Sequence, residues 1–188
     1  MSNKVSKTEA LKTFIAQRAV KRGSFVLASG KVSDVYIDAR LATMSPEGMV
    51  LIGTSGLTTI QSLGWKPDSI GGLTMGADPV AFAISHTSAL EGTPIRAFSV
   101  RKEPKTHGTG NRIEGPFKKG DNVVVVEDVI TTGKSALQAI DAIEEAGGKI
   151  LGILAVVDRN EGGREAVSAR GYHVIALTTK EELITAAP

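Results

Sequence analysis

Short apolar segments alternate with helical segments along most of this 188-residue chain, and this alternation restricts the possible folds more than any other feature. Strands are expected at Ser69–Leu73, Ile95–Val100, Val123–Val126, Ile150–Val157 and His173–Leu177. Helices are expected at Pro46–Leu63, Val80–Leu90, Ser135–Ala146 and Glu161–Arg170. Apolar strands joined by helical crossovers pair in parallel and are covered on both sides. The sequence therefore predicts an α/β fold, a doubly wound and mainly parallel sheet with helices on both faces.

The first 40 residues precede this alternation and have a different pattern. The capping box Ser6-Lys7-Thr8-Glu9 predicts a helix that continues to about Val20. Residues Gly23–Arg40 predict strands joined by a glycine turn at Ser29-Gly30. We expect one domain over residues 1–188, in which residues 1–40 form a helix and a small N-terminal hood over an α/β core at residues 41–177. In the remaining tail, only a short helix around Glu181–Leu183 is expected.

Composition excludes several classes of function. The formal net charge is only +2, which argues against a dedicated nucleic-acid binder. The chain has no cysteine, and its three histidines lack metal-ligand spacing. No segment approaches the roughly 20 apolar residues of a membrane span, and the N-terminus does not resemble a signal peptide. We expect a cytoplasmic protein without a membrane or nucleic-acid partner.

The stretch VVVVEDVITTGKS, from Val123 to Ser135, is typical of a site for a phosphorylated ligand. It is not a Walker A loop, because the first glycine of that motif would fall at Asp128. A glycine turn at a helix N-terminus nevertheless presents free backbone N–H groups, and the hydroxyls of Thr131, Thr132 and Ser135 add further donors. Alternatively, Glu127-Asp128 only caps a helix and Thr131-Thr132-Gly133 is a plain turn, which explains the same residues equally well.

Two adjacent acids, Glu127 and Asp128, follow the four valines. Acids at the carboxyl end of a parallel strand face the ligand crevice of such a sheet. There they can accept hydrogen bonds from vicinal sugar hydroxyls and stabilise positive charge that develops on the sugar ring. Together with the turn, they predict a site for ribose 5-phosphate.

A polar, glycine-rich segment covers Arg101–Pro116 and carries four potential cations within seven residues: Arg101, Lys102, Lys105 and His107. Surface loops of this composition usually have no further role. Alternatively, the segment is a mobile catalytic loop whose cations neutralise a departing polyanion. His107 can be cationic or donate a proton near neutral pH.

These motifs resemble a known family. Val123–Ser135 is similar to the signature of type I phosphoribosyltransferases, which bind phosphoribosyl pyrophosphate (PRPP). The pattern R-K-x-x-K-x-H-G from Arg101 resembles the catalytic loop of the orotate phosphoribosyltransferase family. The hood segments that begin at Phe25 and Tyr36 resemble the N-terminal part of that family. The resemblance covers about residues 14–177 and implies the type I phosphoribosyltransferase fold.

The resemblance implies transfer of ribose 5-phosphate from PRPP to orotate, in the pyrimidine pathway that leads to UMP. It implies a catalytic set of Arg101, Lys102, Lys105, His107 and Asp128. It implies that PRPP contacts Gly76, Ala77, Asp78, Arg101, Lys102, Lys105, His107, Glu127, Asp128, Val129, Ile130, Thr131, Thr132, Gly133, Lys134 and Ser135. It implies that orotate contacts Lys31, Tyr36, Ile37, Thr131 and Arg159.

It further implies a Mg²⁺ cofactor that is carried with PRPP near Asp128, without a dedicated protein cage. Members are usually homodimers whose catalytic loop reaches the neighbouring active site. Two positions depart from a common form of the family, because Ala28 and Met75 stand where lysines are frequent. Those lysines would contact the base side and the pyrophosphate.

Alternatives remain open from the sequence. Arg159 could form only a salt bridge with Asp158 or Glu161. A purine phosphoribosyltransferase would share Val123–Ser135 without needing the catalytic loop or a carboxylate-binding Arg159. A regulatory protein that binds PRPP as an effector and nucleic acid as its target would need a basic face or a further domain.

Overall fold

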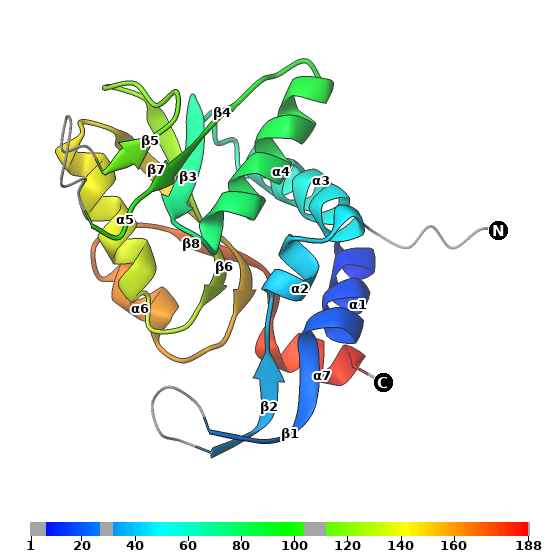
Figure 1. Ribbon diagram of the computed structural model, residues 1–188. Coiled ribbons are helices and arrows are strands. Elements are labelled where there is room, and N and C mark those ends of the chain that lie inside the picture. The colour runs from blue at the N-terminus through cyan, green and yellow to red at the C-terminus, as the bar shows by residue number, and fades with distance from the viewer. Residues whose placement is uncertain (1–6, 27–31, 104–111, 188) are drawn as a thin grey trace.

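The protein is described by a computed structural model that covers residues 7–26, 32–103 and 112–187 (Figure 1). Within these residues the main sheet has six strands in the order β5-β4-β3-β6-β7-β8. The strands are β3 (Ser69–Leu73), β4 (Arg96–Val100), β5 (Ile113–Glu114), β6 (Asn122–Ile130), β7 (Lys149–Asp158) and β8 (Val174–Thr179). All neighbouring pairs are parallel except β4 and β5. The predicted doubly wound, mainly parallel sheet is confirmed.

The strand order reverses its direction between β3 and β6. From β3 the chain passes to β4 on one side, and it then returns to the other side of β3 to form β6, β7 and β8 in succession. The connections after β3 and β6 therefore leave the sheet in opposite directions. A crevice at the carboxyl ends of strands is expected at such a point, and ligands of open α/β sheets bind there.

Helices cover both faces of the sheet. The helices α1 (Lys7–Ala19), α3 (Pro46–Ser62), α4 (Ala77–Leu90) and α7 (Lys180–Ala186) contribute to the hydrophobic cluster on one face. The helices α5 (Lys134–Glu145) and α6 (Gly163–Ser168) contribute to the cluster on the other face. Strand β6 serves both clusters, because Val124 and Val126 belong to the first and Val123 and Val125 to the second. This division follows the two-residue side-chain period of a strand.

The N-terminal segment divides into two parts that pack differently. Strands β1 (Val20–Val26) and β2 (Val32–Ile37) form a separate antiparallel hairpin, which projects beyond the carboxyl ends of the parallel strands (Figure 1). Helix α1 instead packs into the core, where Leu11 and Ile15 are fully buried. A helical period shows which face is apolar but not what that face packs against. The turn predicted at Ser29-Gly30 lies outside the described residues.

Strand β6 is longer than the sequence predicted. The prediction ended the strand at Val126, before the acids, whereas β6 continues through Glu127 and Asp128 to Ile130. Strand β7 pairs along this whole extension, up to the pair Ile130↔Asp158. Pairing with β3 stops at Gly71↔Val125, so the acids lie beyond the part of β6 that pairs with β3. Charged residues appeared to end the strand because pattern reasoning disfavours them in buried strands.

Other boundaries also differ from the predictions. Helix α4 begins at Ala77 rather than Val80, and α6 is shorter than predicted. The short helix α2 (Arg40–Thr43) and the two-residue strand β5 were not predicted. The tail helix is present as α7, with a capping box between Thr179 and Glu182. Among the described residues, no helix has the length and apolar character needed to cross a bilayer.

The packing of α1 predicts a large difference between two substitutions on the same helix. Ile15→Ala removes a fully buried side chain and should lower the free energy of unfolding by about 2–5 kcal/mol. Gln17→Ala, at an exposed position two residues further along the helix, should change it by less than about 0.5 kcal/mol. Urea unfolding followed by circular dichroism measures both values. Equal small effects would show that α1 does not contribute to the core.

Candidate functional site

The connection from β6 to α5 surrounds a small hollow at the carboxyl end of the sheet. The hollow is lined by Glu127, Val129, Ile130, Thr131, Thr132, Gly133, Lys134, Ser135 and Ala136. These residues include the turn that the sequence associated with a phosphate. Figure 1 shows this connection at the lower edge of the sheet, on the same side as the projecting hairpin.

Gly133 gives the turn its shape. It is the N-cap of α5 and has a φ of 77°, in the left-handed region that glycine adopts most easily. A Cβ at this position would lie 2.8 Å from the carbonyl oxygen of Gly163, so the turn also packs tightly against the start of α6. The first N–H groups of α5 have no partner within the helix, and no acidic side chain lies in its first turn. The helix end is thus suited to an anion.

Glu127 is buried beside this turn. Its side chain belongs to a residue that is only 5% exposed, and its Oε1 atom has no hydrogen-bond partner among the described residues. Burial raises the pKa of Glu127 to about 8, and the neighbouring charge of Asp128 acts in the same direction. Glu127 is therefore mainly protonated at neutral pH, so that it can both donate and accept a hydrogen bond.

Asp128 lies beside Glu127 but in a more polar environment. Burial raises its pKa, whereas the Val129 N–H, which donates to Oδ1 at 2.8 Å, and the more distant charge of Arg40 lower it. Gly76 lies directly against this carboxylate, since a Cβ there would be 2.5 Å from Oδ1. The turn after β3 thus closely approaches the acid that extends beyond β3.

The turn after β3 leads into the N-terminus of α4. Gly76 is the N-cap, and Ala77 and Asp78 form the first positions of the helix. The Thr74 hydroxyl donates to Asp78 Oδ2 at 2.6 Å, while Oδ1 of Asp78 is buried and lacks a hydrogen-bond partner within the described chain. The predicted PRPP residues of this turn and those of the β6–α5 turn are therefore on opposite sides of the acid pair.

Arg159 follows β7 on the other side of the acid pair. Its backbone N–H donates to the carbonyl oxygen of Ile130 at 3.0 Å, which places Arg159 beside the end of β6. The guanidinium pairs with Glu161 at 3.0 Å, as one of the two alternatives expected. Asp158 does not pair with it and instead binds Arg164 at 3.0 Å. The Nε atom of Arg159 is buried and has no hydrogen-bond partner in the described residues.

The remaining predicted residues are less fully placed. Arg101 follows β4 and lies 3.6 Å from Glu114, and the carbonyl oxygen of Lys102 accepts a hydrogen bond from Gln138 of α5 at 2.9 Å. Tyr36 is half exposed on β2, whereas Ile37 packs against the core. Lys31, Lys105 and His107 lie outside the described residues.

Sequence reasoning missed two groups near the acid pair. Arg40 and Asp38 form an ion pair at 3.0 Å, and their charges act on Asp128 from the end of the hood. Gly163 supports the phosphate turn through its contact with Gly133. Gly163, Asp38 and Arg40 stand in the sequence, but only the folded chain brings them to the site. Their one available signal was the hood pattern that ends at Arg40.

The sequence matches the profile of the phosphoribosyl transferase domain over residues 57–177. The orotate phosphoribosyltransferase of Aquifex aeolicus is 44% identical over 179 residues, which cover 94% of this chain and 97% of that protein. The crystal structure of the Mycobacterium tuberculosis enzyme of the same name, in complex with PRPP, is 38% identical with a TM-score of 0.80, covering 95% of this chain and 99% of that chain.

An adenine phosphoribosyltransferase from Leishmania tarentolae has a TM-score of 0.65 at 15% identity and covers 96% of this chain and 91% of that chain, a likeness of fold alone. The orotate enzymes match in sequence as well as in fold, over nearly their whole length. This chain belongs to the phosphoribosyltransferase family and, within it, to the orotate phosphoribosyltransferases.

Proposed function

We propose that this protein transfers ribose 5-phosphate from PRPP to orotate, which gives orotidine 5′-monophosphate and pyrophosphate on the route to UMP. The observation that carries this proposal is the position of the acid pair. Glu127 and Asp128 lie between the β6–α5 turn and the β3–α4 turn, with Arg159 at the end of the next strand. One phosphate group, one sugar and one acidic base can thus be bound side by side.

The 5′-phosphate of PRPP would bind to the turn at the start of α5. The backbone N–H groups of Thr132 to Ser135 and the hydroxyls of Thr131, Thr132 and Ser135 supply donors, and Lys134 adds a cation at the first position of the helix. Val129 and Ile130 connect this turn to the acids along β6. Phosphate binding here fixes the distance between the ribose and the acid pair.

The acid pair would bind the 2′- and 3′-hydroxyls of the ribose. A protonated Glu127 donates one hydrogen bond and accepts another, while Asp128 keeps more of its negative charge because Val129 and Arg40 oppose the effect of burial. As the C1–O bond to pyrophosphate breaks, positive charge develops on the ribose ring. Asp128 would stabilise that charge, and the new C1–N bond to orotate would form on the opposite face with inversion.

The pyrophosphate would leave toward the β3–α4 turn and the loop that follows β4. Gly76, Ala77 and Asp78 are at the N-terminus of α4, where backbone N–H groups favour an anion. Arg101, Lys102, Lys105 and His107 would neutralise the growing charge of the leaving group, and His107 could also protonate it. No nucleophilic side chain or general base is needed, since the orotate ring nitrogen attacks as an anion.

The base would bind between the β7–α6 connection and the hood. The carboxylate of orotate matches the Arg159 guanidinium, whose buried Nε has a donor to offer and whose present partner is the exposed Glu161. Thr131 lies at the start of the phosphate turn. Its carbonyl oxygen packs closely against Gly163, where the β7–α6 connection ends. Tyr36, Ile37 and Lys31 of the hood would cover the other side of the base.

We further propose Mg²⁺ as the cofactor, carried with PRPP near Asp128. Among the described residues, no group of three or more His, Cys, Asp or Glu side chains could hold a metal ion. Asp128 fits the one or two carboxylates that Mg²⁺ usually takes beside substrate oxygens. When bound, the ion would neutralise part of the charge on the pyrophosphate.

The proposed reaction predicts turnover of orotate that depends on both PRPP and Mg²⁺. We expect the ultraviolet absorbance of orotate to fall when all three are mixed with the protein, and not to fall when a chelator removes the Mg²⁺. Adenine, guanine, uracil and xanthine, followed by product chromatography, should not react. Turnover on a purine instead of orotate would contradict the proposal.

Arg159→Ala tests the base site in the same assay. It should raise the KM for orotate about ten- to a hundredfold, because it removes a charged hydrogen-bond donor, and should leave the KM for PRPP nearly unchanged. Arg170→Ala is the control, since Arg170 pairs with Asp141 at 3.0 Å on the outer surface of α5. Equal KM values for orotate in both variants would remove Arg159 from the base site.

The buried Glu127 predicts a pH-dependent stability. Its pKa in the folded protein is about 8, above its ordinary value of 4.5, so the unfolded chain releases this proton at lower pH. The free energy of unfolding should therefore fall as pH rises from about 4.5 through about 8. Glu127→Gln cannot lose this proton, so its stability relative to the natural protein should increase over the same interval, by at most a few kcal/mol.

Urea unfolding at pH 5, 7 and 9 measures this difference. Glu145→Gln, which removes an exposed glutamate of α5, is the control for the loss of one surface charge. A constant difference between Glu127→Gln and the natural protein at all three pH values would contradict a proton-linked Glu127.

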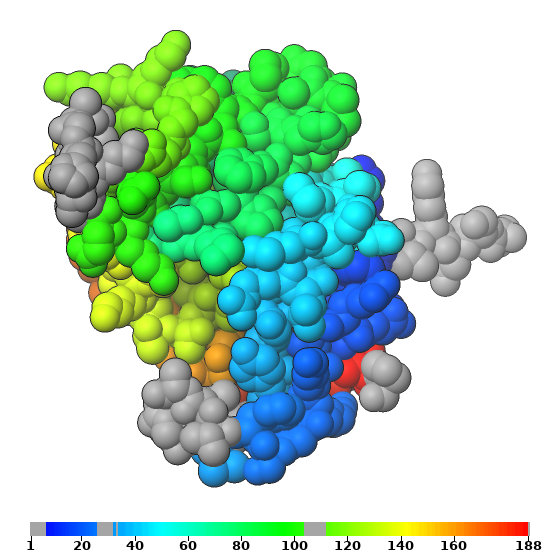
Figure 2. All heavy atoms as spheres, in the orientation of Figure 1, coloured from blue at the N-terminus to red at the C-terminus, as the bar shows by residue number. Residues whose placement is uncertain are grey.

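We also propose that the protein is a cytoplasmic homodimer whose loop at residues 101–116 reaches the neighbouring site. An exposed apolar patch supports association. It is formed by Leu41, Met44 and Met75, which line one groove and whose exposed fractions are 46%, 44% and 60%. In Figure 2 the light-blue surface of α2 meets the teal and green surface of the following elements on the visible face. Cell fractionation tests the location.

Light scattering after size-exclusion chromatography should give the mass of a dimer. Met44→Glu should shift it toward the monomer, because it places a charge in the patch, while Leu90→Glu at the far end of α4 should not. Mixed Lys105→Ala and Asp128→Asn subunits should recover part of the activity that each variant lacks. A monomeric natural protein would contradict the shared loop.

A further inference from the structure

The C-terminal helix α7 contacts three separate parts of the chain through polar groups. Lys12 of α1 binds Glu182 at 2.7 Å, and Arg22 of β1 donates to the carbonyl oxygen of Ile184 at 3.0 Å. The side-chain amide of Asn160, which follows β7, donates to Glu181 at 2.5 Å. One helix therefore connects α1, the hood and the connection that carries Arg159.

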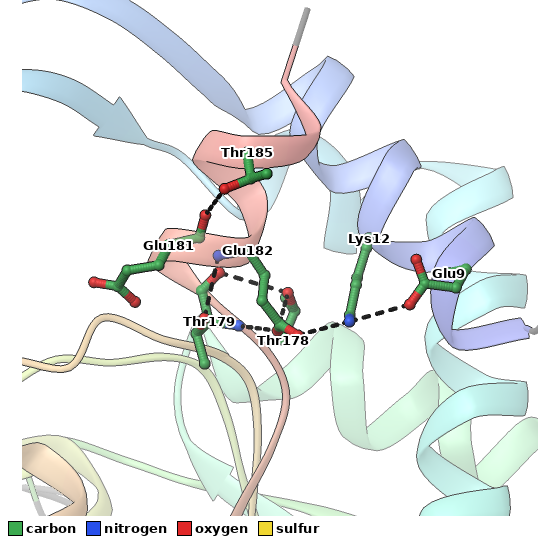
Figure 3. Close-up of polar contacts among 7 residues, drawn as sticks. All are labelled: Glu9, Lys12, Thr178, Thr179, Glu181, Glu182 and Thr185. Atoms are coloured by element: carbon green, nitrogen blue, oxygen red, sulfur yellow. Dashed lines mark hydrogen bonds and ion pairs between the residues drawn. The ribbon is translucent and has the colours of Figure 1, made fainter.

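The two adjacent glutamates of α7 have different partners. Figure 3 shows Glu182 turned toward Lys12, with Glu181 on the other side of the helix. Glu182 completes the capping box, with hydrogen bonds from the Thr179 N–H at 2.9 Å and the Thr178 hydroxyl at 3.0 Å, and Lys12 helps to hold its pKa below the ordinary value. Glu182 is thus committed to helix docking, whereas Glu181 extends to the β7–α6 connection.

Asn160 is held on two sides. Its backbone has a φ of 52°, in the left-handed region that asparagine adopts more readily than most residues. Its N–H donates to the buried Asp158 carboxylate at 2.8 Å, and its side chain donates to Glu181. Arg159 lies between these two fixed residues, so the direction of its side chain depends on both.

The hood side of the base site depends on the same helix. Arg22 lies on β1 next to Lys21, and Lys21 pairs with Tyr36 of β2. The contact between Arg22 and Ile184 therefore ties the strand pair that carries Tyr36 to α7. The two walls proposed for the base, the hood and the Arg159 connection, are thus each joined to α7 by a hydrogen bond between described residues.

We propose that α7 positions the base-binding wall of the site, with Glu181 acting through Asn160 to direct Arg159 toward the substrate. Glu181 and Asn160 would be positioning residues, since neither needs to touch orotate. The identity of the substrate in this inference rests on the proposed function. The claim that Glu181 and Asn160 hold the Arg159 connection does not. It predicts that a helix at the end of the chain influences the affinity for one of the two substrates.

The test compares three single variants of α7 in the full-length protein. Glu181→Ala should raise the KM for orotate about two- to fivefold. This is a small effect for the loss of a hydrogen bond, because the side chains of Glu181 and Asn160 are both exposed. The KM for PRPP and kcat should not change. Glu181→Gln keeps an acceptor for Asn160 and should remain close to the natural protein. Thr185→Ala, which removes only a hydrogen bond within α7, should also do so.

A second measurement needs no substrate. Hydrogen exchange of a peptide that covers residues 158–164 should be faster in Glu181→Ala than in the natural protein, and unchanged in Thr185→Ala. In Asn160→Gly, which keeps the left-handed backbone and loses the side chain, adding Glu181→Ala should have no further effect on either readout.

The outcomes separate the two claims. An unchanged exchange rate in Glu181→Ala would overturn the positioning role. So would an increase in KM that is the same for orotate and PRPP and that is equal in Glu181→Ala and Thr185→Ala. Equal behaviour of Glu181→Gln and Glu181→Ala would assign the effect to the charge near the helix N-terminus and also overturn it. A natural protein that does not turn over orotate would contradict the proposed function, while the exchange experiment would still decide whether Glu181 holds the connection.

Discussion

The incomplete pairing between β3 and β6 is the constraint on which the site depends. Beyond the pair Gly71↔Val125, β6 continues to Ile130 with β7 as its neighbour, and the chain after β3 turns into α4. The acids therefore occupy a strand but face a turn on one side. Gly76 fills that side without a side chain, because a Cβ would meet the Asp128 carboxylate at 2.5 Å. If β3 continued to pair with β6 beyond this point, its backbone would cover the acids and close the crevice.

The same arrangement has an energetic consequence for the fold. A nearly fully buried carboxyl group such as that of Glu127, whose Oε1 has no hydrogen-bond partner among the described residues, is unfavourable, and more so when it is ionised. The surrounding sheet is apolar and well packed on both faces, with Val123 to Val126 fully buried, so it can hold Glu127 in place. Buried polar groups of this kind are concentrated at functional sites, where a ligand supplies the missing partner.

The sheet and the phosphate turn could be predicted from the sequence because their signals are local. Apolar runs and helical periods identify β3, β4, β6 and β7, and Gly133 before Ser135 identifies a turn at a helix start. The extension of β6 could not be predicted, since it depends on a neighbouring strand rather than on Glu127 or Asp128 themselves. The packing of α1 on the core, the two-residue strand β5, and the approach of Arg40 and Gly163 to the site are likewise tertiary. The roles of all the predicted site residues stay predictions, and Lys31, Lys105 and His107 lie outside the described residues.

The protonation of Glu127 also affects how the site receives PRPP. PRPP carries phosphate and pyrophosphate groups and is strongly anionic, so two ionised acids at the centre of the crevice would repel it. Burial leaves Glu127 mainly neutral at pH 7, and the site then carries less negative charge than two ionised acids would give it. A surface of carboxyl groups that binds hydroxyls can thereby receive a polyanion with less electrostatic repulsion. Burial of Glu127 disfavours its ionisation, and it thereby also lowers the repulsion that PRPP meets on entering the site.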